Sequence, residues 1–583
     1  MTEQKISHYI TKSKELDNIQ FNKKIRVAVL SSFTINGVEE TLRVKCAEKK
    51  IECITYIGGY NQYHQNILDD KSKLYEFLPD ITFLLVDSRT ILGELFYSPY
   101  SLSVSERKDF VDKKSKELLE LVDSFTKKTN SKLVVANLTI PTYSPYGIFE
   151  TKTKYGLHHM VYDINNKLSE GITNNDSVYL YDFNGFVSRF GENNVFDFKQ
   201  FLFGDIKIAL DYISYFANDL IGYIIALLGL TSRCIVLDLD NTLWGGVVGE
   251  DGFDGIKLGK GPPGNAYVEF QRILLSLQKR GVLLAINSKN NPEDALKVIN
   301  EHPDMILRKE HFACLKINWN DKVSNMKEIA EDLNFGLDYM VFFDDDPVNR
   351  EFMCNNLPQV LTVELPKDPA QYVKTLQNMK EFNTLNITDE DMKRGVMYLQ
   401  QQKRKEFENS APDLEGFLRN LNTKVSILPA DKFTIPRISQ LTLKTNQFNL
   451  TTKRYQEEEI QRFSKDNQIL VGCAQVEDKF GDNGITSVFI IKNDKPQEWV
   501  LDTFLLSCRV MGREVEKGIL DYIIKKAKEN KIKKIKAEYI PTQKNKPIEN
   551  FLPNCGFKKE GNYWIYNCDE EFKVPDFLVI SVK

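Results

Sequence analysis

The chain has 583 residues, too many for a single typical domain, so about three domains are expected. A net charge of −4 does not indicate nucleic-acid binding, and 42% hydrophobic with 27% charged residues is an ordinary globular composition. Nine scattered cysteines without a C-x-x-C pair, and an N-terminus without an apolar signal segment, predict a cytoplasmic protein with reduced thiols.

Residues 1–205 alternate short apolar runs with longer amphipathic segments, a pattern that predicts a doubly wound parallel sheet in a first α/β domain. Helices are expected between the strands, for example over Ser105–Lys128 and Tyr155–Leu168. The expected strands are Ile25–Ser31, Ile51–Gly58, Ile81–Asp87, Lys132–Leu138 and Val178–Phe183.

This layout resembles the Ser-Gly-Asn-His (SGNH) hydrolase fold, with Ser31 and Ser32 after the first strand and Asn137 after the fourth. A serine hydrolase needs a base, and that fold takes its histidine from near the end of the domain. Residues 181–203 contain no histidine. We therefore expect a non-hydrolytic binding or docking domain rather than an esterase.

Residues 206–231 are predicted to be a packing helix and linker. The run Ile213–Leu230 is the most apolar helix-like segment of the chain, but it carries Asn218 and Asp219. A helix packed on a sheet explains this run better than a membrane span, so no membrane partner is expected.

Residues 232–380 are predicted to form a second α/β domain around the segment Arg233–Gly252. Cys234–Leu239 is apolar except for Asp238, and Asp240, Asn241 and Thr242 follow at once. A short apolar run with turn residues after it indicates a buried parallel strand, and open α/β sheets bind ligands at the carboxyl ends of such strands. Two carboxylates there can act as nucleophile and general acid/base in phosphoryl transfer.

Three further polar elements follow in order. Ser288 ends a second apolar strand, Lys322 lies ahead of a helical segment, and Asp344 and Asp345 end a third strand. Two like charges at 4 Å repel by about 4 kcal/mol at an effective dielectric constant of 20, so clustered carboxylates favour a bound divalent cation. Hard oxygen ligands with room for water and phosphate select Mg²⁺.

The order and strand contexts of these elements resemble the haloacid dehalogenase (HAD) superfamily. The resemblance implies that Asp238 forms an aspartyl-phosphate, that Asp240 protonates the leaving group and activates water, and that Ser288 and Lys322 bind the phosphoryl group. It also implies that Mg²⁺ is held by Asp238, the Asp240 carbonyl, and Asp344 or Asp345, with Asp346 outside the site. Residues 243–287 and 289–321 have no room for a folded cap, so we expect an open, capless cleft that could accept a macromolecule-borne substrate.

Residues 381–423 are predicted to be a helical connector, helical over Asp389–Leu421, and residues 424–583 an α+β domain. The latter combines a helix over Arg513–Lys528 with several strands. The expected strands are Gln468–Val476, Thr486–Lys492 and Lys534–Ile540.

Six strings together resemble the FkbH-like proteins over nearly the whole chain. These are LDLDNTLWGGVVGEDG, SKNN, FDDDPVNRE, INWNDKVSN, KTNQFNLTT and SCRVMGREVE. The resemblance implies an enzyme that takes a glyceryl unit from a phosphorylated three-carbon donor, 1,3-bisphosphoglycerate, releases phosphate, and loads the acyl group onto an acyl carrier protein in a polyketide-like pathway. Some members have an acyl-relay cysteine where this chain has Asn287, so another thiol such as Cys508 could serve, or the acyl group could pass directly.

The last domain resembles GNAT-type acyltransferases, whose R-x-x-G-x-G/A loop cradles a pyrophosphate at a helix start. Arg509 and Gly512 match this pattern, but Glu514 replaces a small residue and would repel an anion. We therefore expect this domain to hold a pantetheine arm or the carrier protein. The candidate substrate- or carrier-binding residues are Thr242, Asn241, Arg509, Gly512 and Asn446.

Two alternatives to the transferase remain open at this level. The first is a HAD phosphatase that acts on a free or carrier-bound phosphorylated small molecule. The second is a non-catalytic scaffold that binds the carrier, although a relic site would not need to retain Asp238, Asp240, Ser288 and Lys322 together.

Overall fold

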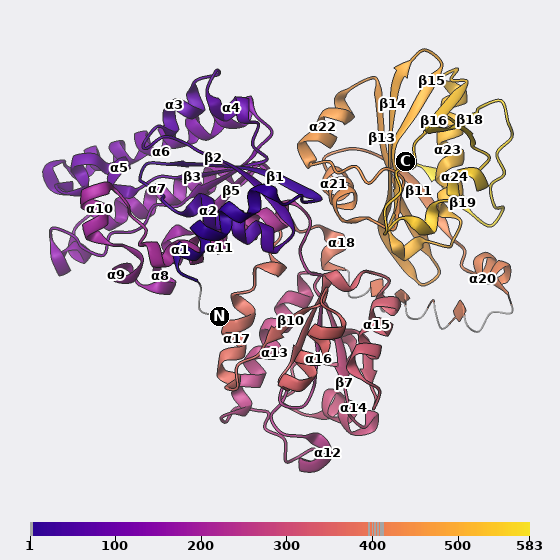
Figure 1. The fold of residues 1–583 in the computed structure, drawn as a ribbon, viewed down its shortest axis with the longest axis horizontal. Helices are drawn as coiled ribbons and strands as arrows, with labels where there is room; N and C mark the ends of the chain where they lie inside the picture. The colour runs from indigo at the N-terminus through magenta and orange to yellow at the C-terminus, as the bar shows by residue number, and fades with distance from the viewer. Residues whose placement is uncertain (1–3, 394–396, 399, 402–403, 405–406, 409–412) are drawn as a thin grey trace. The chain divides into compact units, whose positions relative to one another are not determined.

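The chain divides into two units, Met1–Ile224 and Ile225–Lys583 (Figure 1). The computed structural model describes residues 4–393, 397–398, 400–401, 404, 407–408 and 413–583. None of the helices described is both long enough and apolar enough to cross a membrane. The first unit contains one parallel sheet, and the second contains a parallel sheet followed by a mixed sheet.

The sheet of the first unit has five strands, all parallel, and its aliphatic residues are almost completely buried. All five strands predicted from the sequence are confirmed. In order across the sheet they are β2 (Ile51–Ile57), β1 (Lys23–Ser31), β3 (Ile81–Leu85), β4 (Lys132–Ala136) and β5 (Val178–Tyr181).

Helices cover both faces of this sheet. One face packs against α3 (Tyr63–Leu68), α4 (Lys73–Phe77), α6 (Val104–Lys128) and α7 (Leu157–Ile172) in one apolar cluster. On the other face, Tyr223 of α11 (Ile213–Leu227) packs against Phe83 and donates a hydrogen bond to the Leu180 carbonyl. The apolar run is therefore a helix that packs on a sheet, and the sheet is that of the first unit, although the first domain was expected to end near residue 205. The other α-helices of this unit are α1 (Ile6–Glu15), α2 (Val38–Glu48), α5 (Ser88–Leu92), α8 (Phe183–Phe190), α9 (Glu192–Val195) and α10 (Phe198–Gly204).

The first sheet of the second unit is also five-stranded and wholly parallel. The strand predicted after Arg233 is its central strand, so the carboxyl ends of this strand and its two neighbours lie side by side. The order across the sheet is β10 (Leu361–Glu364), β9 (Met340–Asp344), β6 (Cys234–Leu237), β7 (Leu283–Ser288) and β8 (Phe312–Ile317).

Short connections join these strands. Between β6 and β7 the chain forms only α12 (Val248–Asp251) and α13 (Gly264–Lys279), and between β7 and β8 it forms α14 (Pro292–Glu301) with a short 3₁₀ turn. The prediction of a capless domain is confirmed, because neither connection contains a folded cap. The remaining α-helices are α15 (Lys322–Leu333), α16 (Pro347–Asn356) and α17 (Tyr372–Gln377).

The helical connector predicted over 389–421 falls partly on residues outside the described part of the chain, namely 394–396, 399, 402–403, 405–406 and 409–412. Two helices are described at its ends, α18 (Asp389–Met392) and α20 (Leu414–Asn420).

The C-terminal sheet is mixed, which confirms the α+β prediction. Its strands in spatial order are β17 (Lys558–Glu560), β18 (Tyr563–Asn567), β16 (Lys534–Ala537), β15 (Glu498–Leu506), β14 (Gly481–Lys495), β13 (Ile469–Asp478), β11 (Lys424–Pro429) and β19 (Val579–Val582), with β12 (Phe448–Asn449) paired to β15. The α-helices that follow or precede them are α21 (Ile435–Lys444), α22 (Glu457–Lys465), α23 (Val515–Glu529) and α24 (Phe551–Asn554).

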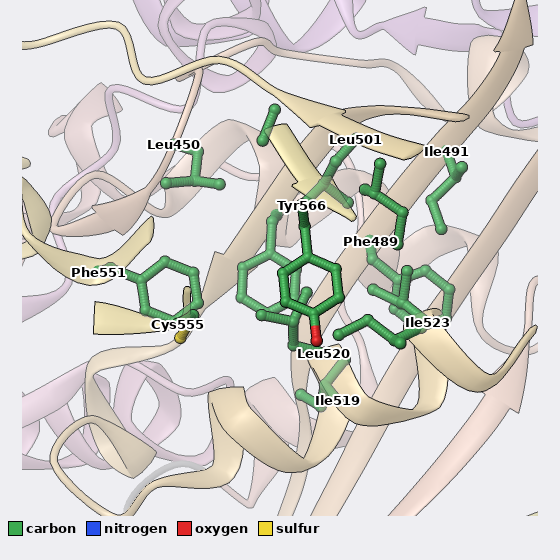
Figure 2. Close-up of a cluster of buried hydrophobic side chains, with 14 of the residues drawn as sticks. Leu450, Phe489, Ile491, Leu501, Ile519, Leu520, Ile523, Phe551, Cys555 and Tyr566 are labelled. Atoms are coloured by element: carbon green, nitrogen blue, oxygen red, sulfur yellow. The ribbon is translucent and has the colours of Figure 1, made fainter. Parts of the chain in front are cut away.

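One apolar cluster joins this sheet to α23. Figure 2 shows Phe489 and Tyr566 facing Leu520 and Ile523 of the helix, and all four are almost completely buried. The apolar period of 3.6 residues in α23 places these side chains on one face, which explains why the helix packs here. Tyr566 keeps its hydroxyl satisfied by donating to the Glu570 carbonyl at 3.2 Å.

Candidate active site

The four polar elements predicted from the sequence meet at the carboxyl edge of the parallel sheet in the second unit. Asp238 directly follows β6, Ser288 ends β7, and Asp344 ends β9. Lys322 starts α15, and its Nζ lies 2.9 Å from Asp238 Oδ1 and 2.6 Å from Asp344 Oδ2. These side chains are nearly sealed from solvent, with Asp344 0%, Ser288 1%, Lys322 3% and Asp238 7% exposed.

Lys322 is held by its helix and by a neighbouring amide. Asp321 caps α15 by accepting a hydrogen bond from Ser324 N, which fixes where the helix begins. Asn287, fully buried on β7, donates to the Lys322 carbonyl at 2.8 Å and accepts from Asn325 Nδ2 at 3.2 Å. The residue that stands in place of a family cysteine therefore positions the backbone of the lysine.

Three carboxylates share this edge with one ammonium. Carboxylate oxygens of Asp238, Asp344 and Asp345 lie within 4.8 Å of one another. Burial, followed by repulsion from Asp238, raises the pKa of Asp344, and the same causes raise that of Asp345 to about 6. Burial opposes the charge on Lys322, but Asp238 and Asp344 outweigh it and raise its pKa. The site thus has an excess of negative charge that one lysine does not neutralise.

This donor set fits a divalent cation with oxygen ligands. The three carboxylates come from two adjacent strand ends, and a cation between them would offset the burial and repulsion that raise the pKa values of Asp344 and Asp345. Arg350, which the sequence reasoning missed although it lies in the FDDDPVNRE string, donates to the carbonyls of Asp344 and Asp345 at 2.8 and 2.6 Å. Asp346 instead caps α16 by accepting from Val348 N, in agreement with its expected place outside the site.

Asp240 is oriented by three donors. Its Oδ1 accepts from Trp244 Nε1 at 2.9 Å and from Val248 N at 3.0 Å, and its Oδ2 accepts from Asn290 Nδ2 at 2.8 Å. Burial raises the pKa of Asp240 even though these bonds favour the ionised form. A fixed carboxyl with a raised pKa suits a general acid and base. Asn290, in the SKNN string, is a second residue that the sequence reasoning missed.

The loop after Asp240 is held by its own side chains. Asn241 adopts a left-handed φ of 54°, accepts from Gly246 N through Oδ1 at 2.8 Å, and accepts from the Tyr372 hydroxyl through its carbonyl at 3.1 Å. Thr242 is fully buried, and its hydroxyl has no hydrogen-bond partner among the described residues. Both residues shape the loop next to the cluster, and their predicted contact with substrate stays a prediction.

The other candidate binding residues lie elsewhere in the second unit. Arg509 and Asn446 line a cavity together with Cys508, whereas Gly512 is outside its lining. Gly512 and Glu514 both have left-handed backbone angles, with φ of 76° and 62°, and Glu514 pairs with Lys517.

The hydrolase-like residues of the first unit are engaged with one another. Ser32 Oγ accepts from Asp87 N at 2.8 Å, and Asn137 Nδ2 donates to Asp182 at 2.7 Å. Asp87 in turn is paired with Lys207 at 2.6 Å. Ser32 and Asp87 are buried, whereas Asn137 is half-buried and Asp182 is exposed. Both hydrogen bonds lie at the edge of the sheet where a hydrolase would need a reactive serine.

Comparison with known proteins adds to this geometry. Residues 26–225 match the model of the FkbH N-terminal domain family. A search of curated proteins gave no match.

Among solved structures, the N-terminal part of the protein BF1531 from Bacteroides fragilis, described as containing a phosphatase domain complexed with Mg, is 27% identical. The match covers 66% of this chain and 100% of that chain, with a TM-score of 0.61. A GNAT-family acetyltransferase from Staphylococcus aureus is 14% identical over 25% of this chain and 99% of its own, with a TM-score of 0.20. The chain is a HAD-type phosphatase enzyme, and its residues 26–225 resemble the N-terminal domain of FkbH proteins.

Proposed function

We propose that this enzyme uses Mg²⁺ to dephosphorylate a phosphoglyceryl donor such as 1,3-bisphosphoglycerate and loads the glyceryl unit onto an acyl carrier protein. The observation that carries the phosphoryl step is the buried cluster of Lys322 with Asp238, Asp344 and Asp345 at an uncapped sheet edge. The Bacteroides fragilis domain crystallised with Mg supports the same ion here. None of the nine cysteines, all of which are among the described residues, forms a disulfide, in keeping with a reducing compartment such as the cytosol.

The phosphoryl step follows from the placement of two carboxyls. An Asp238 oxygen attacks the phosphorus of the phosphomonoester. The bond between phosphorus and the ester oxygen of the glyceryl donor breaks, and Asp240 gives its proton to that departing oxygen. Asp240 then takes a proton from water, which attacks the aspartyl-phosphate and releases inorganic phosphate. Lys322 and Ser288 neutralise and orient the phosphoryl oxygens.

Mg²⁺ bound by Asp238, Asp344, Asp345 and the Asp240 carbonyl would offset the negative charge of cluster and phosphate. Asp238 needs this charge balance because a dianionic phosphate otherwise meets three carboxylates.

The acyl step joins the donor to the carrier. The carrier thiol, as thiolate, attacks the acyl-phosphate carbonyl, the bond from carbon to the phosphate oxygen breaks, and a second phosphate leaves. The uncapped edge supports a macromolecular acceptor, and Trp319, 74% exposed in the loop between β8 and Lys322, offers an aromatic anchor beside it. Burial raises the pKa of Cys508, which disfavours the thiolate that an acyl relay would need. Direct transfer to the carrier thiol is therefore the simpler route.

The test is the intact mass of a holo acyl carrier protein after incubation with enzyme, Mg²⁺ and 1,3-bisphosphoglycerate, with phosphate release followed in parallel. Wild type should add a glyceryl-sized mass, and Asp238→Asn should abolish both signals. Asp346→Asn is the matched control, because it removes the same charge two residues from the Asp344 ligand while asparagine remains a good helix cap.

Other outcomes separate the alternatives. Phosphate release by wild type at full rate without any carrier, and no mass gain with one, would leave a phosphatase of a free small molecule. Carrier loading that is unchanged in Asp238→Asn would contradict the proposed role of this carboxylate and favour a scaffold.

A further inference from the structure

A second candidate site lies in the second unit, away from the carboxylate cluster. It is a cavity of about 340 Å³, within the size range of small-molecule sites. Residues at the amino ends of the parallel strands line one side, among them Arg233 and Tyr339. The end of α21 and the turn after β15 line the other, including Lys444, Asn446 and Arg509.

The lining is cationic. Five lining residues carry a positive charge and none carries a carboxylate; the cations are Arg233, Arg437, Lys444, Arg509 and Lys544. Asn, Gln, Ser and Thr side chains supply most of the remaining polar surface. Such a lining favours a negatively charged ligand with further polar groups.

Two of these arginines, the buried Arg509 and the partly buried Arg233, have no counter-ion in the part of the chain that is described. Arg509 is 8% exposed, and its guanidinium contacts the Ser507 hydroxyl and the Met397 sulfur. Arg233 donates to the Lys444 carbonyl and stacks on Tyr339, while its buried Nε has no acceptor. Charged groups are almost always paired when buried, because an unpaired buried charge is costly.

The guanidinium groups of Arg233 and Arg509 both influence the thiol of Cys508. Arg509 and Arg233 each favour the ionised form of Cys508, which lies in the lining, although burial is the larger effect and raises the pKa of this thiol. Burial lowers the pKa of the adjacent Arg454, and repulsion from Arg233 adds to this shift. Lys544 is already paired with Asp338 at 2.6 Å, so the positive potential on which the site depends is that of Arg233 and Arg509.

This cavity cannot be part of the carboxylate cluster. Arg233 precedes β6 and Asp238 follows it, and five residues of extended chain span roughly 16 Å. The cluster is negative and the cavity is positive, so each has its own electrostatic preference.

We propose that this cavity is an anion-binding site for a small phosphate ester with a polar body, separate from the metal cluster. The phosphate lies against Arg233 and Arg509, whose planar forks match phosphate oxygens. The side-chain amide of Gln447 binds a hydroxyl or amide group of the rest of the ligand. Because the site does not use the carboxylate cluster, it fills without a divalent ion.

The experiment uses the full chain in EDTA with sn-glycerol 3-phosphate as probe. Without metal, the three carboxylates repel phosphate at the cluster and hydrolysis is suppressed, so titration calorimetry reports the cavity. We expect one binding site, at least tenfold weakened in Arg509→Gln and in Arg233→Gln. Arg272→Gln, an exposed arginine of α13, is the matched control and should bind as wild type does.

A second readout and a second variant keep the test sharp. The probe should slow alkylation of Cys508, followed by peptide mass spectrometry, and should not slow alkylation of the exposed Cys354. Gln447→Glu adds a carboxylate to the lining without removing an arginine and should also weaken binding at least tenfold, in case an arginine variant does not fold.

Three results would overturn the proposal. One is the absence of binding and of Cys508 protection in EDTA. Another is equal binding by wild type, Arg509→Gln, Arg233→Gln and Gln447→Glu. The last is binding that Lys322→Gln abolishes while the arginine variants retain it, which would move the ligand to the metal cluster. None of these results bears on carrier loading, so the proposed function is tested independently.

Discussion

Two parallel sheets of this chain each bury a lysine against aspartate at the carboxyl edge, and the two arrangements differ in charge balance. In the first unit Lys207 Nζ lies 2.6 Å from Asp87 Oδ1, with a further bond to Thr139 Oγ1 at 3.1 Å. Rings of Phe33, Phe183 and Phe196 surround the ammonium at 4.7 to 5.8 Å. The positive charge of Lys207 is balanced by the negative charge of Asp87, and both side chains are buried.

In the second unit Lys322 is equally buried but meets three carboxylates. The unbalanced charge leaves a place for a cation and a phosphate, and raised pKa values mark it. The difference teaches that a buried Asp–Lys pair at a strand end is not a sign of catalysis by itself. The feature that indicates a catalytic site is an excess of like charge, which costs the folded state some stability.

The largest expected effect separates the two lysines by stability. Lys207→Met should destabilise the first unit by about 3–5 kcal/mol, because Asp87 would stay buried without its partner. All four tryptophans, Trp244, Trp319, Trp499 and Trp564, lie in the second unit, so fluorescence does not report on the first. Hydrogen exchange of peptides from β1 and β3 is the measurement, and phosphate release should be unchanged.

A double variant controls this prediction. Asp87→Leu combined with Lys207→Met removes both charges and should recover most of the lost protection, since buried pairs are often replaceable by apolar residues. Unchanged exchange in the single variant would mean that the pair does not stabilise this edge.

The next prediction tests whether the excess negative charge around Lys322 binds a metal ion. A cation that binds only the folded state stabilises it by about 2.7 kcal/mol at a hundredfold excess over its Kd. Wild type should therefore gain thermal stability in the second unit on addition of Mg²⁺, read by tryptophan fluorescence. Asp344→Asn should lose most of this gain, whereas Asp87→Asn should keep it. A gain that persists in Asp344→Asn would place the ion elsewhere.

Much of the fold and of the carboxylate cluster could be predicted from sequence, because both depend on local patterns of apolar and polar residues. Apolar runs ending in polar residues located all five strands of the first parallel sheet and three of the second, and the same runs located Asp238, Ser288 and Asp344. The two edge strands of the second sheet, β8 and β10, were not located in this way. The parallel sheet places β6 between β9 and β7, so the carboxyl ends of these three strands lie side by side. Lys322 was located because it starts the helix before the third strand.

The rest depends on contacts that no local pattern encodes. Lys207 meets Asp87 across 120 residues, and nothing in the sequence near either residue indicates the pair. The cavity joins Arg233 to Arg509 in the same way, from segments far apart in the chain. Residues 206–224 fold with the first unit, although composition alone suggested a boundary near residue 205.

A smaller effect concerns how each lysine is held. Lys207 depends on its ion pair, whereas the backbone of Lys322 is fixed by Asn287. Asn287→Ala should slow phosphate release from p-nitrophenyl phosphate by about tenfold, or about 1.4 kcal/mol, through misplacement of Lys322. Stabilisation by Mg²⁺ should remain, because the carboxylates are untouched. Equal loss of both would mean that the variant disturbs the whole sheet edge.

The smallest effect is a pH dependence that burial and the excess charge together impose on the metal-free enzyme. The folded-state pKa of Asp345, about 6, exceeds the unfolded value of about 3.9, so the folded state holds this proton more tightly. Its contribution to stability is complete below about pH 4 and is lost as the pH rises through 6. In EDTA, Asp345→Asn should therefore gain stability over wild type as the pH rises from 4 to 7, by roughly 1 kcal/mol after allowance for the partial exposure of this side chain. Urea unfolding followed by tryptophan fluorescence measures this difference. A difference that stays constant over this range would show that neither burial nor repulsion raises the pKa of Asp345, and the contrast with the balanced pair of the first unit would fail.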